Sequence, residues 1–352
     1  MVSKGWRRGF DELGRRDFAA AARAAVALCV PLVVLTAVGR TDLSVYAAFG
    51  AFTALYGRNE PYRARLVTLS VAAISLWATI CGGIALAVTD PPQWVVGLAL
   101  AVTVVFGIAT SEVMNWVPRG SIFFVFALMV MANQSLEAAR APEAVAVAAA
   151  TAGFSILLGM SGWLLRRVLP QHQGELFLWP LQRRPVRALS PVRTRTYWYL
   201  AGINVIGIVG AWIIALAFGV GHPYWASVAV AAVMPTLAAL TGYARMWHRF
   251  VGTAAGVVVA AVLFVWGPPI WLMVAILTLC SFGAEMFVAR RYDIALLFIT
   301  PLALGTANLA ERRDWYPLFV DRFVETGLGV ALAFVIVFAA RRVVLREAPS
   351  AG

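Results

Sequence analysis

Residues 222–228, HPYWASV, open the stretch that decides the fold of this chain, because an apolar run and a basic turn follow them directly. The turn ends at Arg249 and leads into the glycine-containing segment FVGTAAG at 250–256. Tyr224 and Trp225 are amphipathic rings of the kind that sit at a membrane–water interface. The stretch therefore predicts one membrane helix, a turn and the start of a second helix.

Glycines and prolines give this stretch further features. Gly252 and Gly256 are four residues apart, so they share one helix face and allow a neighbouring helix to approach closely. Pro235 interrupts the apolar run, and Pro31 and Pro301 interrupt two other apolar runs. We expect bent helices at these three prolines, around a cavity or as plain packing kinks.

The same stretch has an echo later in the chain. Residues 248–256, HRFVGTAAG, and residues 321–329, DRFVETGLG, match at five of nine positions. Arg249 corresponds to Arg322, and the last glycine corresponds to Gly329. A match at the start of two apolar helices predicts a repeated unit, with Gly329 as a helix-packing position.

Composition places the chain in a membrane. It is 61% hydrophobic and 13% charged, with a mean hydropathy of +0.81, whereas soluble domains are about a quarter charged. A net charge of +12 suggests nucleic acid as the partner of a soluble protein. In a membrane protein basic loops fix the orientation, so we expect the lipid bilayer as a partner and no nucleic acid.

Chemical motifs are scarce. The three cysteines lie inside apolar runs and the three histidines lack metal-ligand spacing, which predicts no disulfide framework, no metal site and no cofactor. Nucleotide-binding signatures, a nucleophile elbow and a metal-binding helix motif are missing from the sequence. We therefore expect neither an enzyme nor an ATP-driven transporter.

The apolar runs predict an all-α, polytopic membrane bundle with about twelve transmembrane helices. The predicted spans are 19–38, 43–57, 66–88, 94–114, 120–133, 143–164, 197–218, 223–241, 250–266, 269–287, 293–307 and 321–340. They divide into two six-span halves, 19–164 and 197–340. The remaining segments are a basic arm at 1–18, a basic linker at 165–196 and a basic tail at 341–352.

Charge supports this order of spans. If the N-terminus is cytoplasmic, 23 of the 29 lysines and arginines fall in cytoplasmic loops and ends, and 4 fall in outer loops. Such a split follows the positive-inside rule, since the loss of one span would scramble the alternation. We expect both termini and the linker 165–196 in the cytoplasm, the linker having no core of its own.

Matching residues near span ends predict that the two halves are repeats. Glu112 and Glu285 end spans four and ten, 173 residues apart, and Asn133 and Asn308 end spans five and eleven, 175 residues apart. The first echo lies only three spans apart, so its two copies would face opposite sides of the membrane. Nested inverted repeats of this kind occur in transporters.

At these residues the chain resembles the fusaric acid resistance protein-like (FUSC) family, whose better-known members are aromatic acid exporters. The resemblance implies efflux of small organic, often aromatic, carboxylates across the inner membrane. Larger members carry a soluble domain between the halves, where this chain has only 165–196. The residues that carry the resemblance are 223–226, Arg249, Gly252, Thr253, Gly256, 298–301, Arg322, Thr326 and Gly329, and more weakly 46–57, Arg63 and Arg65.

Four polar residues are candidate substrate contacts. An arginine can bind a carboxylate through two hydrogen bonds, so we name Arg249 and Arg322. The alternatives are an orienting charge for Arg249 and an ion pair with Glu325 for Arg322. Asn133 and Asn308 are further candidates, with a helix cap or a hydrogen bond between helices as the alternative.

Two carboxylates are candidates for proton coupling. Ionisable groups inside a span are costly and often serve proton pathways, which favours Glu112 and Glu285. The alternative is pairing at the interface, with Arg119 for the first and with Arg290 and Arg291 for the second.

The sequence supports three hypotheses for function. The favoured one is a secondary transporter that exports small organic carboxylates and is driven by protons. The second is a passive anion channel, and the third is a membrane scaffold whose linker 165–196 docks a partner. Whether identical chains associate as a homo-oligomer is left open.

Overall fold

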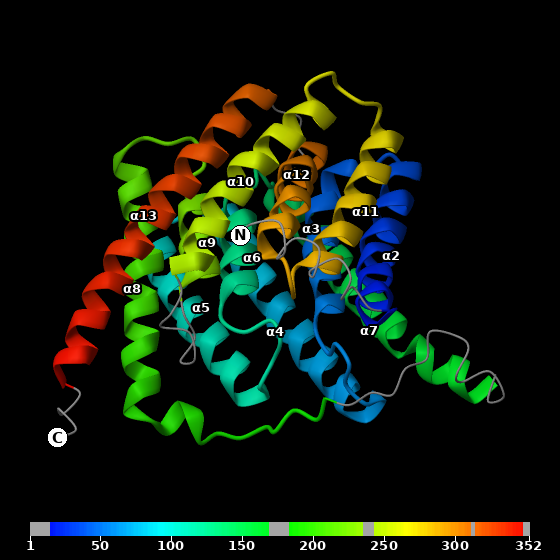
Figure 1. The fold of residues 1–352 in the computed structure, drawn as a ribbon. Helices are drawn as coiled ribbons and strands as arrows, with labels where there is room; N and C mark the ends of the chain where they lie inside the picture. The colour runs from blue at the N-terminus through cyan, green and yellow to red at the C-terminus, as the bar shows by residue number, and fades with distance from the viewer. Residues whose placement is uncertain (1–14, 169–182, 235–242, 311–313, 348–352) are drawn as a thin grey trace, which may run out of the picture.

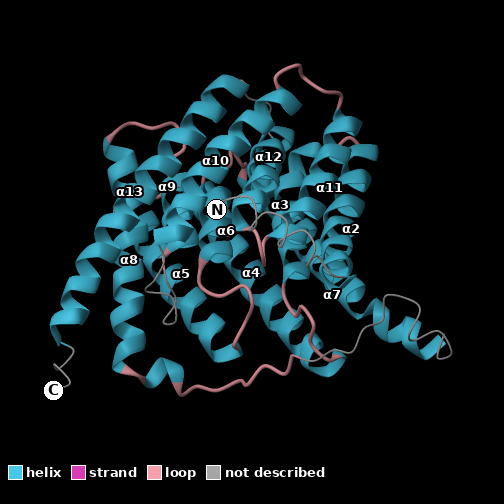
Figure 2. Cartoon of the chain, viewed as in Figure 1, coloured by secondary structure: helices cyan, strands magenta, loops and turns pink. Residues whose placement is uncertain are grey.

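The computed structural model describes residues 15–168, 183–234, 243–310 and 314–347, and every regular element in these ranges is a helix (Figure 1). Figure 2 shows the same helices with their short connections. The prediction of an all-α fold is confirmed. The helices are α2 (Arg15–Ala37), α3 (Ser44–Ala51), α4 (Tyr62–Thr89), α5 (Gln93–Met114), α6 (Ile122–Ala132), α7 (Ala141–Val168), α8 (Arg195–Ala217), α9 (Tyr224–Val233), α10 (Tyr243–Phe264), α11 (Ile270–Phe287), α12 (Tyr292–Ala310) and α13 (Trp315–Glu347).

Nine of these helices are long and apolar enough to cross a membrane. The other three, α3, α6 and α9, have 8, 11 and 10 residues, whereas a spanning helix needs about 20. The sequence predicted spans at 43–57, 120–133 and 223–241 in their place, so nine of the twelve predicted spans coincide with a described helix that is long and apolar enough to cross a membrane. Short 3₁₀ turns, η1 (Thr41–Leu43) and η2 (Phe52–Leu55), extend α3 at its two ends.

The three short helices lie inside the bundle. All eight residues of α3 are buried, and so are nine of the ten residues of α9. Such helices face other helices on every side, so they need not be long enough to span the hydrocarbon core of the bilayer. Among the nine long helices, α12 is the most buried. The outer faces of the long helices instead expose apolar side chains, which suits contact with lipid: Leu98, Val102, Leu157, Ile206, Ile213, Val258, Val262, Leu279 and Val335.

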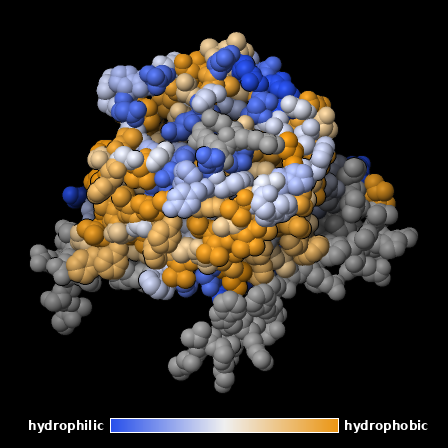
Figure 3. Space-filling model, turned by 90° about the horizontal axis from the view of Figure 1, so that it is seen from above, coloured by the Kyte–Doolittle hydropathy of each residue, from blue (hydrophilic) through white to orange (hydrophobic). Residues whose placement is uncertain are grey.

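Consecutive helices run in opposite directions from α2 to α13 (Figure 1). We call the end with residues 58–61, 115–121, 183–194 and 288–291 the lower end, and the other end the upper end. Figure 3 looks onto the upper end, where hydrophobic side chains occupy much of the rim and hydrophilic ones gather nearer the middle and at one edge. This distribution suits a bundle whose sides face lipid and whose ends face water.

The packing of α2–α7 is matched by the packing of α8–α13. Helix α3 packs on α7 as α9 packs on α13, and α4 packs on α6 and α7 as α10 packs on α12 and α13. Between the two groups, α2 packs on α11 and α8 on α5, while α3 meets α12 and α9 meets α6. Each group therefore contributes its central helices to one shared interior.

Glycines allow several of these helices to meet closely. A Cβ added at Gly256 of α10 would lie 2.6 Å from the carbonyl oxygen of Leu296 in α12, and one at Gly252 would lie 2.7 Å from the Leu296 side chain. A Cβ at Gly329 of α13 would lie 2.6 Å from the carbonyl oxygen of Ala226 in α9. Only a residue without a side chain fits at such contacts.

The three predicted bends have different outcomes. Pro31 lies inside α2 and Pro301 inside α12, and both helices continue past the proline. Pro235 lies outside the described residues. Pro301 is also buried, so its neighbours are side chains of the bundle and not lipid.

Candidate functional site

A cavity of about 190 Å³ lies between the two groups of helices. Seven aromatic residues line its wall, and several of their rings touch one another. The ring centroid of Phe126 in α6 lies 4.8 Å from that of Phe49 in α3 and 5.2 Å from that of Trp225 in α9. The rings of Phe52 and Phe123 are 5.1 Å apart. We call this space the central cavity, and its wall is suited to the face of an apolar ring.

Three arginines line the central cavity, Arg245, Arg249 and Arg322, and the last two are almost fully buried. Arg249 of α10 is 2% exposed and Arg322 of α13 is 1% exposed, and both line it. Nη1 of Arg249 donates a hydrogen bond of 3.0 Å to the hydroxyl of Tyr292. The guanidinium of Arg322 lies 3.8 Å from the centre of the Trp225 ring, a cation–π contact.

Both guanidinium groups keep buried N–H groups that have no acceptor among the described residues. These are Nε and Nη2 of Arg249 and Nε and Nη1 of Arg322. An unpaired buried donor costs free energy, and a charged one costs more than a neutral one. Two wall residues of the central cavity, Arg249 and Arg322, therefore hold four buried nitrogens that an anionic acceptor would stabilise.

Glu325 does not supply that acceptor. Its side-chain oxygens accept hydrogen bonds from the backbone N–H groups of His222, at 2.9 Å, and Trp225, at 3.1 Å. The carboxylate thereby caps the start of α9, where unpaired N–H groups and the helix dipole favour a negative charge. The ion pair between Arg322 and Glu325, which was the predicted alternative, does not form, because the carboxylate of Glu325 is used at the start of α9.

A second cavity of about 450 Å³ adjoins the central cavity at the lower end, and we call it the vestibule. The two share wall residues, among them Leu55, Phe123 and Glu285. Glu112 lines the vestibule but not the central cavity. Both predicted proton-coupling residues therefore line these cavities, Glu285 in the wall that the two share and Glu112 in the vestibule.

The surroundings of the two glutamates differ. Glu285 is 9% exposed, and its Oε1 accepts a hydrogen bond of 3.2 Å from Arg58. Arg58 also pairs with Asp17 of α2, and Arg290 lies 3.1 Å from the same carboxylate. Glu112 has no ion pair among the described residues. Glu285 therefore pairs with Arg58, which lies 227 positions away in the chain, and not with Arg290 as predicted.

Two further arginines were predicted as partners of the glutamates and pair elsewhere. Arg119 donates to the side chain of Asn115 at 3.2 Å. Arg291 donates to Asp293 at 3.1 and 2.9 Å, and these hydrogen bonds raise the pKa of Arg291.

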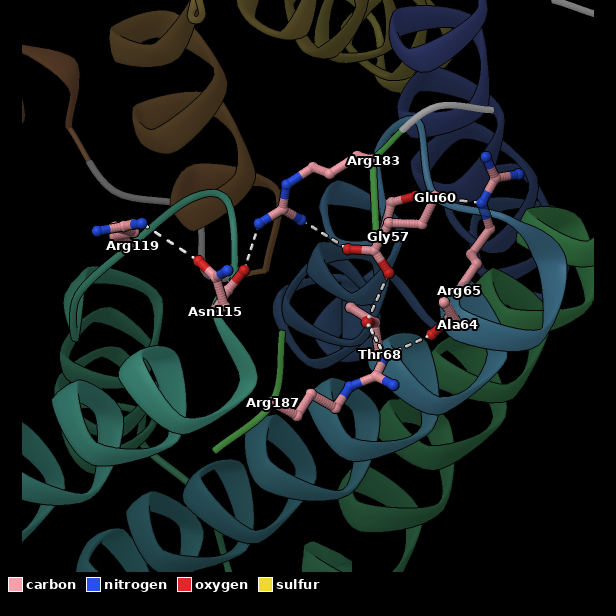
Figure 4. A network of polar contacts seen from close by, with 9 residues as sticks. All are labelled: Gly57, Glu60, Ala64, Arg65, Thr68, Asn115, Arg119, Arg183 and Arg187. Atoms are coloured by element: carbon pink, nitrogen blue, oxygen red, sulfur yellow. Dashed lines mark hydrogen bonds and ion pairs between the residues drawn. The ribbon is translucent and has the colours of Figure 1, made fainter. Parts of the chain in front are cut away.

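The described end of the linker is fastened to the lower end beside the vestibule (Figure 4). Arg183 lies 2.7 Å from the fully buried carboxylate of Glu60 and also donates to the backbone carbonyl of Asn115. The other oxygen of Glu60 accepts a hydrogen bond of 2.7 Å from Thr68, to which Arg187 donates at 3.0 Å. These contacts hold the linker against α4 and the end of α5.

The two predicted asparagines do not line either cavity. The side chain of Asn133 donates to the carbonyl oxygen of Met129 at 2.7 Å, within the end of α6. Asn308 is 6% exposed in α12. The geometry of Asn133 matches the alternative of a helix-end hydrogen bond.

Sequence reasoning missed most of the aromatic wall. Trp225 and Tyr224 were predicted at the membrane interface, but they are 2% and 4% exposed inside the bundle, so that prediction is wrong. Tyr292 and the phenylalanines of α3 and α6 were not singled out. The signal that marks them is the shortness of two predicted spans, because an apolar run of 10–14 residues favours a buried helix over a spanning one.

Comparison with known proteins gives one match. Residues 210–336 match the family model described as fusaric acid resistance protein-like, which covers 127 of the 352 residues. Searches of curated proteins and of solved structures found no match. The matched segment contains Trp225, Arg249, Glu285, Tyr292 and Arg322. The chain is therefore a multi-pass, transporter-like membrane protein with a fusaric acid resistance protein-like region at residues 210–336, as its resemblance to that family predicted.

Proposed function

We propose that this protein is a secondary transporter of the inner membrane that exports small aromatic carboxylates at the expense of the proton gradient. The observation that carries the proposal is the central cavity, an aromatic enclosure with unpaired guanidinium N–H groups of Arg249 and Arg322. An aromatic carboxylate presents an apolar ring to the wall and two oxygens to the arginines, so both parts of the cavity are satisfied by one molecule.

The size of the cavity favours a single ring. Its volume of about 190 Å³ falls below the roughly 300–1,000 Å³ of pockets that hold drug-sized ligands, and above the roughly 150 Å³ of an engineered cavity that binds benzene. We therefore expect benzoate-like acids to bind and fused multi-ring acids to bind poorly.

The charge pattern supports a cytoplasmic opening of the two cavities. The lower end carries the arginine-rich turns and the linker, so the positive-inside rule assigns this end to the cytoplasm. The vestibule lies there and adjoins the central cavity. Substrate therefore enters from the cytoplasm, as export requires.

The matched packing of α2–α7 and α8–α13 supports a carrier built from two related halves. In such proteins one half rocks against the other around a fixed central site. The central cavity lies between these groups, where a rocking motion would expose it to either side. Glu285 is the favoured coupling residue, because it lines both cavities, and Glu112 is the second choice.

Reconstituted proteoliposomes test the proposal. We expect benzoate to move against its concentration gradient when a proton gradient is imposed, and an uncoupler to stop that movement. Strictly downhill flux would support a passive anion channel instead, and no flux of any carboxylate would support a scaffold. Cells that lack the protein should also become more sensitive to aromatic acids.

A pair of variants ties the flux to the cavity. Arg322→Ala should reduce benzoate flux about tenfold or more, because a charge-assisted hydrogen bond contributes about 1.5–3 kcal/mol. Arg193→Gln is the matched control, since Arg193 is exposed at the end of the linker and lines neither cavity. Unchanged flux in Arg322→Ala, with equal protein in the membrane, would remove Arg322 from the site.

A further inference from the structure

The upper end of α8–α13 holds ionisable side chains that the proposed export cycle has not used. His222 lies in the connection between α8 and α9, and its Nδ1 is 2.7 Å from Oδ2 of Asp321 in α13. Their side chains are 12% and 16% exposed, so water at this end can bring a proton to them. The backbone N–H of His222 donates to Glu325, one helical turn beyond Asp321, at 2.9 Å. We call His222, Asp321 and Glu325 the upper cluster.

The ionisable side chains beside His222 come from two helices, Tyr224 from α9 and Asp321, Arg322 and Glu325 from α13. Of the other segments that adjoin α9, residues 218–221, the whole of α6 and the part of α8 after Tyr199 contain no ionisable side chain. Arg249 of α10 acts on Arg322, but within the described ranges it has no hydrogen bond or ion pair with the upper cluster. When both carboxylates are ionised, a neutral His222 leaves two negative charges beside Arg322, and a protonated His222 balances them.

The matching place in α2–α7 uses permanent charges instead. Helix α3 packs on α7 as α9 packs on α13, and residues just before α3 pair with residues at the start of α7. Arg40 pairs with Glu143, and Arg140 pairs with Asp42. Arginine keeps its proton at physiological pH, whereas histidine changes its charge between about pH 5 and 8. The contact that joins α9 to α13 at the upper end can therefore gain or lose a charge, and the one that joins α3 to α7 cannot.

The upper cluster is connected to the wall of the central cavity. Helix α9 begins two residues after His222 and carries Trp225, and the guanidinium of Arg322 in α13 lies 3.8 Å from the centre of the Trp225 ring. Glu325 accepts hydrogen bonds from the backbone N–H groups of both His222 and Trp225. Any force that draws His222 to Asp321 thus also holds this side of the cavity wall against α13.

We infer that His222, paired with Asp321, is a proton-binding site that closes the upper end of the transporter. In the neutral ring Nδ1 carries a hydrogen that it donates to Asp321, and Nε2 takes up a proton from water. The resulting imidazolium forms an ion pair with the carboxylate, which holds α9 on α13. The inference rests on the proposed function, where the positive-inside rule assigns the upper end to the outside. Acid outside the cell then favours the state in which the cavities open only to the cytoplasm.

Proton binding is tested on the ring itself. The full chain is labelled with ¹⁵N-histidine and placed in lipid nanodiscs, and the chemical shifts of the ring nitrogens are followed with pH. The sequence contains three histidines, so His222→Gln identifies the signals of His222. We expect them to titrate between about pH 5 and 8, and in Asp321→Asn to titrate at a lower pH, because the imidazolium loses its carboxylate. A ring that keeps one protonation state over this range would overturn the inference.

Closure is tested by access to the cavity. Ala303, which lines the central cavity, is replaced by cysteine in a chain whose three native cysteines are changed to alanine. A small membrane-impermeant thiosulfonate is added outside right-side-out vesicles, and the rate of modification is measured at acid and at neutral pH. Comparison with His222→Gln at the same pH cancels the pH dependence of the thiol. At acid pH the rate should be about fivefold lower with His222 present than in His222→Gln, since one ion pair is lost.

Two further variants separate this effect from loss of the fold. His222→Arg copies the permanent charge used beside α3, so it should keep modification slow at neutral pH as well, which a misfolded protein would not do. His248→Gln is the matched control, because His248 is exposed at the start of α10 and lines neither cavity. It should behave as the wild type does. Equal rates with and without His222 at acid pH, including no modification in either, would overturn the inference.

The outcomes distinguish this inference from the proposed function. Modification that depends on His222 and pH, together with no uphill movement of any carboxylate, would leave the proton-binding site and reject the exporter. Uphill benzoate transport, together with modification that does not depend on His222, would leave the exporter and reject the proton-binding site.

Discussion

Arg65 in α4 and Arg322 in α13 are both buried, at 6% and 1% exposure, but their guanidinium groups are used in different ways. Nε of Arg65 donates to the carbonyl oxygen of Gly57 at 3.1 Å and Nη1 donates to that of Gly159 at 3.2 Å. Arg322 lies on the Trp225 ring and leaves Nε and Nη1 without an acceptor.

The difference separates a structural arginine from a binding one. Arg65 joins the turn before α4 to α7, and its hydrogen bonds satisfy carbonyl groups of the protein itself. Arg322 makes no hydrogen bond of this kind within the described residues, and it lines the central cavity. Burial alone does not identify a functional arginine; the identity of its hydrogen-bond acceptors does.

The strongest test of this difference replaces each arginine, one at a time, by methionine, which keeps much of the side-chain volume. Arg65→Met should lower the free energy of unfolding by about 3 kcal/mol, because two buried carbonyl groups lose their donors. Arg322→Met should leave stability unchanged or raise it by about 1 kcal/mol, because an unpaired buried charge is removed and sulfur packs well on an aromatic ring. Thermal unfolding in detergent, followed by intrinsic fluorescence, measures both changes.

Substrate binding should respond in the opposite order. Benzoate affinity should fall about tenfold or more in Arg322→Met and stay near the wild-type value in Arg65→Met, once the fraction of folded protein is taken into account. If Arg322→Met destabilises the protein as much as Arg65→Met does, Arg322 is a structural residue and the comparison fails.

A second test asks whether α2–α7 and α8–α13 pack alike, although their buried arginines Arg65 and Arg322 differ in hydrogen bonding. Gly50 of α3 meets α7 as Gly329 of α13 meets α9, and an added Cβ would lie 2.6 Å from a carbonyl oxygen in both cases, that of Ala148 or that of Ala226. Gly50→Ala and Gly329→Ala should therefore each lower the free energy of unfolding by about 2 kcal/mol.

Gly153 of α7 provides the control for that test, since nothing lies within 4 Å of a Cβ added there. Gly153→Ala should be neutral or raise stability by about 0.5 kcal/mol, because alanine favours the helix over glycine. A large effect at Gly329 with none at Gly50 would show that the two groups pack differently, against the repeat that the sequence predicts.

The positions of the helices could be predicted from the sequence, but three of their roles could not. Each of the twelve helices overlaps one predicted span, although several begin or end outside it, because apolar runs bounded by polar turns locate helices well. Hydropathy does not distinguish a helix that faces lipid from one that faces other helices, since both are apolar. The runs at 43–57 and 120–133 were short for spans, and length was the one local sign that α3 and α6 lie inside.

The arginines of the cavity could be named from the sequence, but their partners could not. Arg249 and Arg322 were found through a repeated motif, which is local information. The partner of Glu285 is Arg58, from a turn 227 positions away, whereas sequence reasoning chose the neighbouring Arg290 and Arg291. Trp225 was predicted at the membrane interface because its ring is amphipathic. That property does not show which residues surround the ring in the folded protein.

The smallest expected effects on stability concern the two glutamates, which occupy matching places in the two halves and have different neighbours. Glu285→Gln should lower the free energy of unfolding by about 1 kcal/mol, because the charged hydrogen bond with Arg58 is weakened. Glu112→Gln should leave stability unchanged, because Glu112 has no ion pair among the described residues.

Proteoliposome flux then provides the decisive readout. In Glu285→Gln an imposed proton gradient should no longer drive benzoate uphill, although downhill exchange continues, since a permanently neutral side chain cannot carry a proton. Glu112→Gln should keep uphill transport, and the reverse result would move the coupling residue from the shared wall of the two cavities to the vestibule.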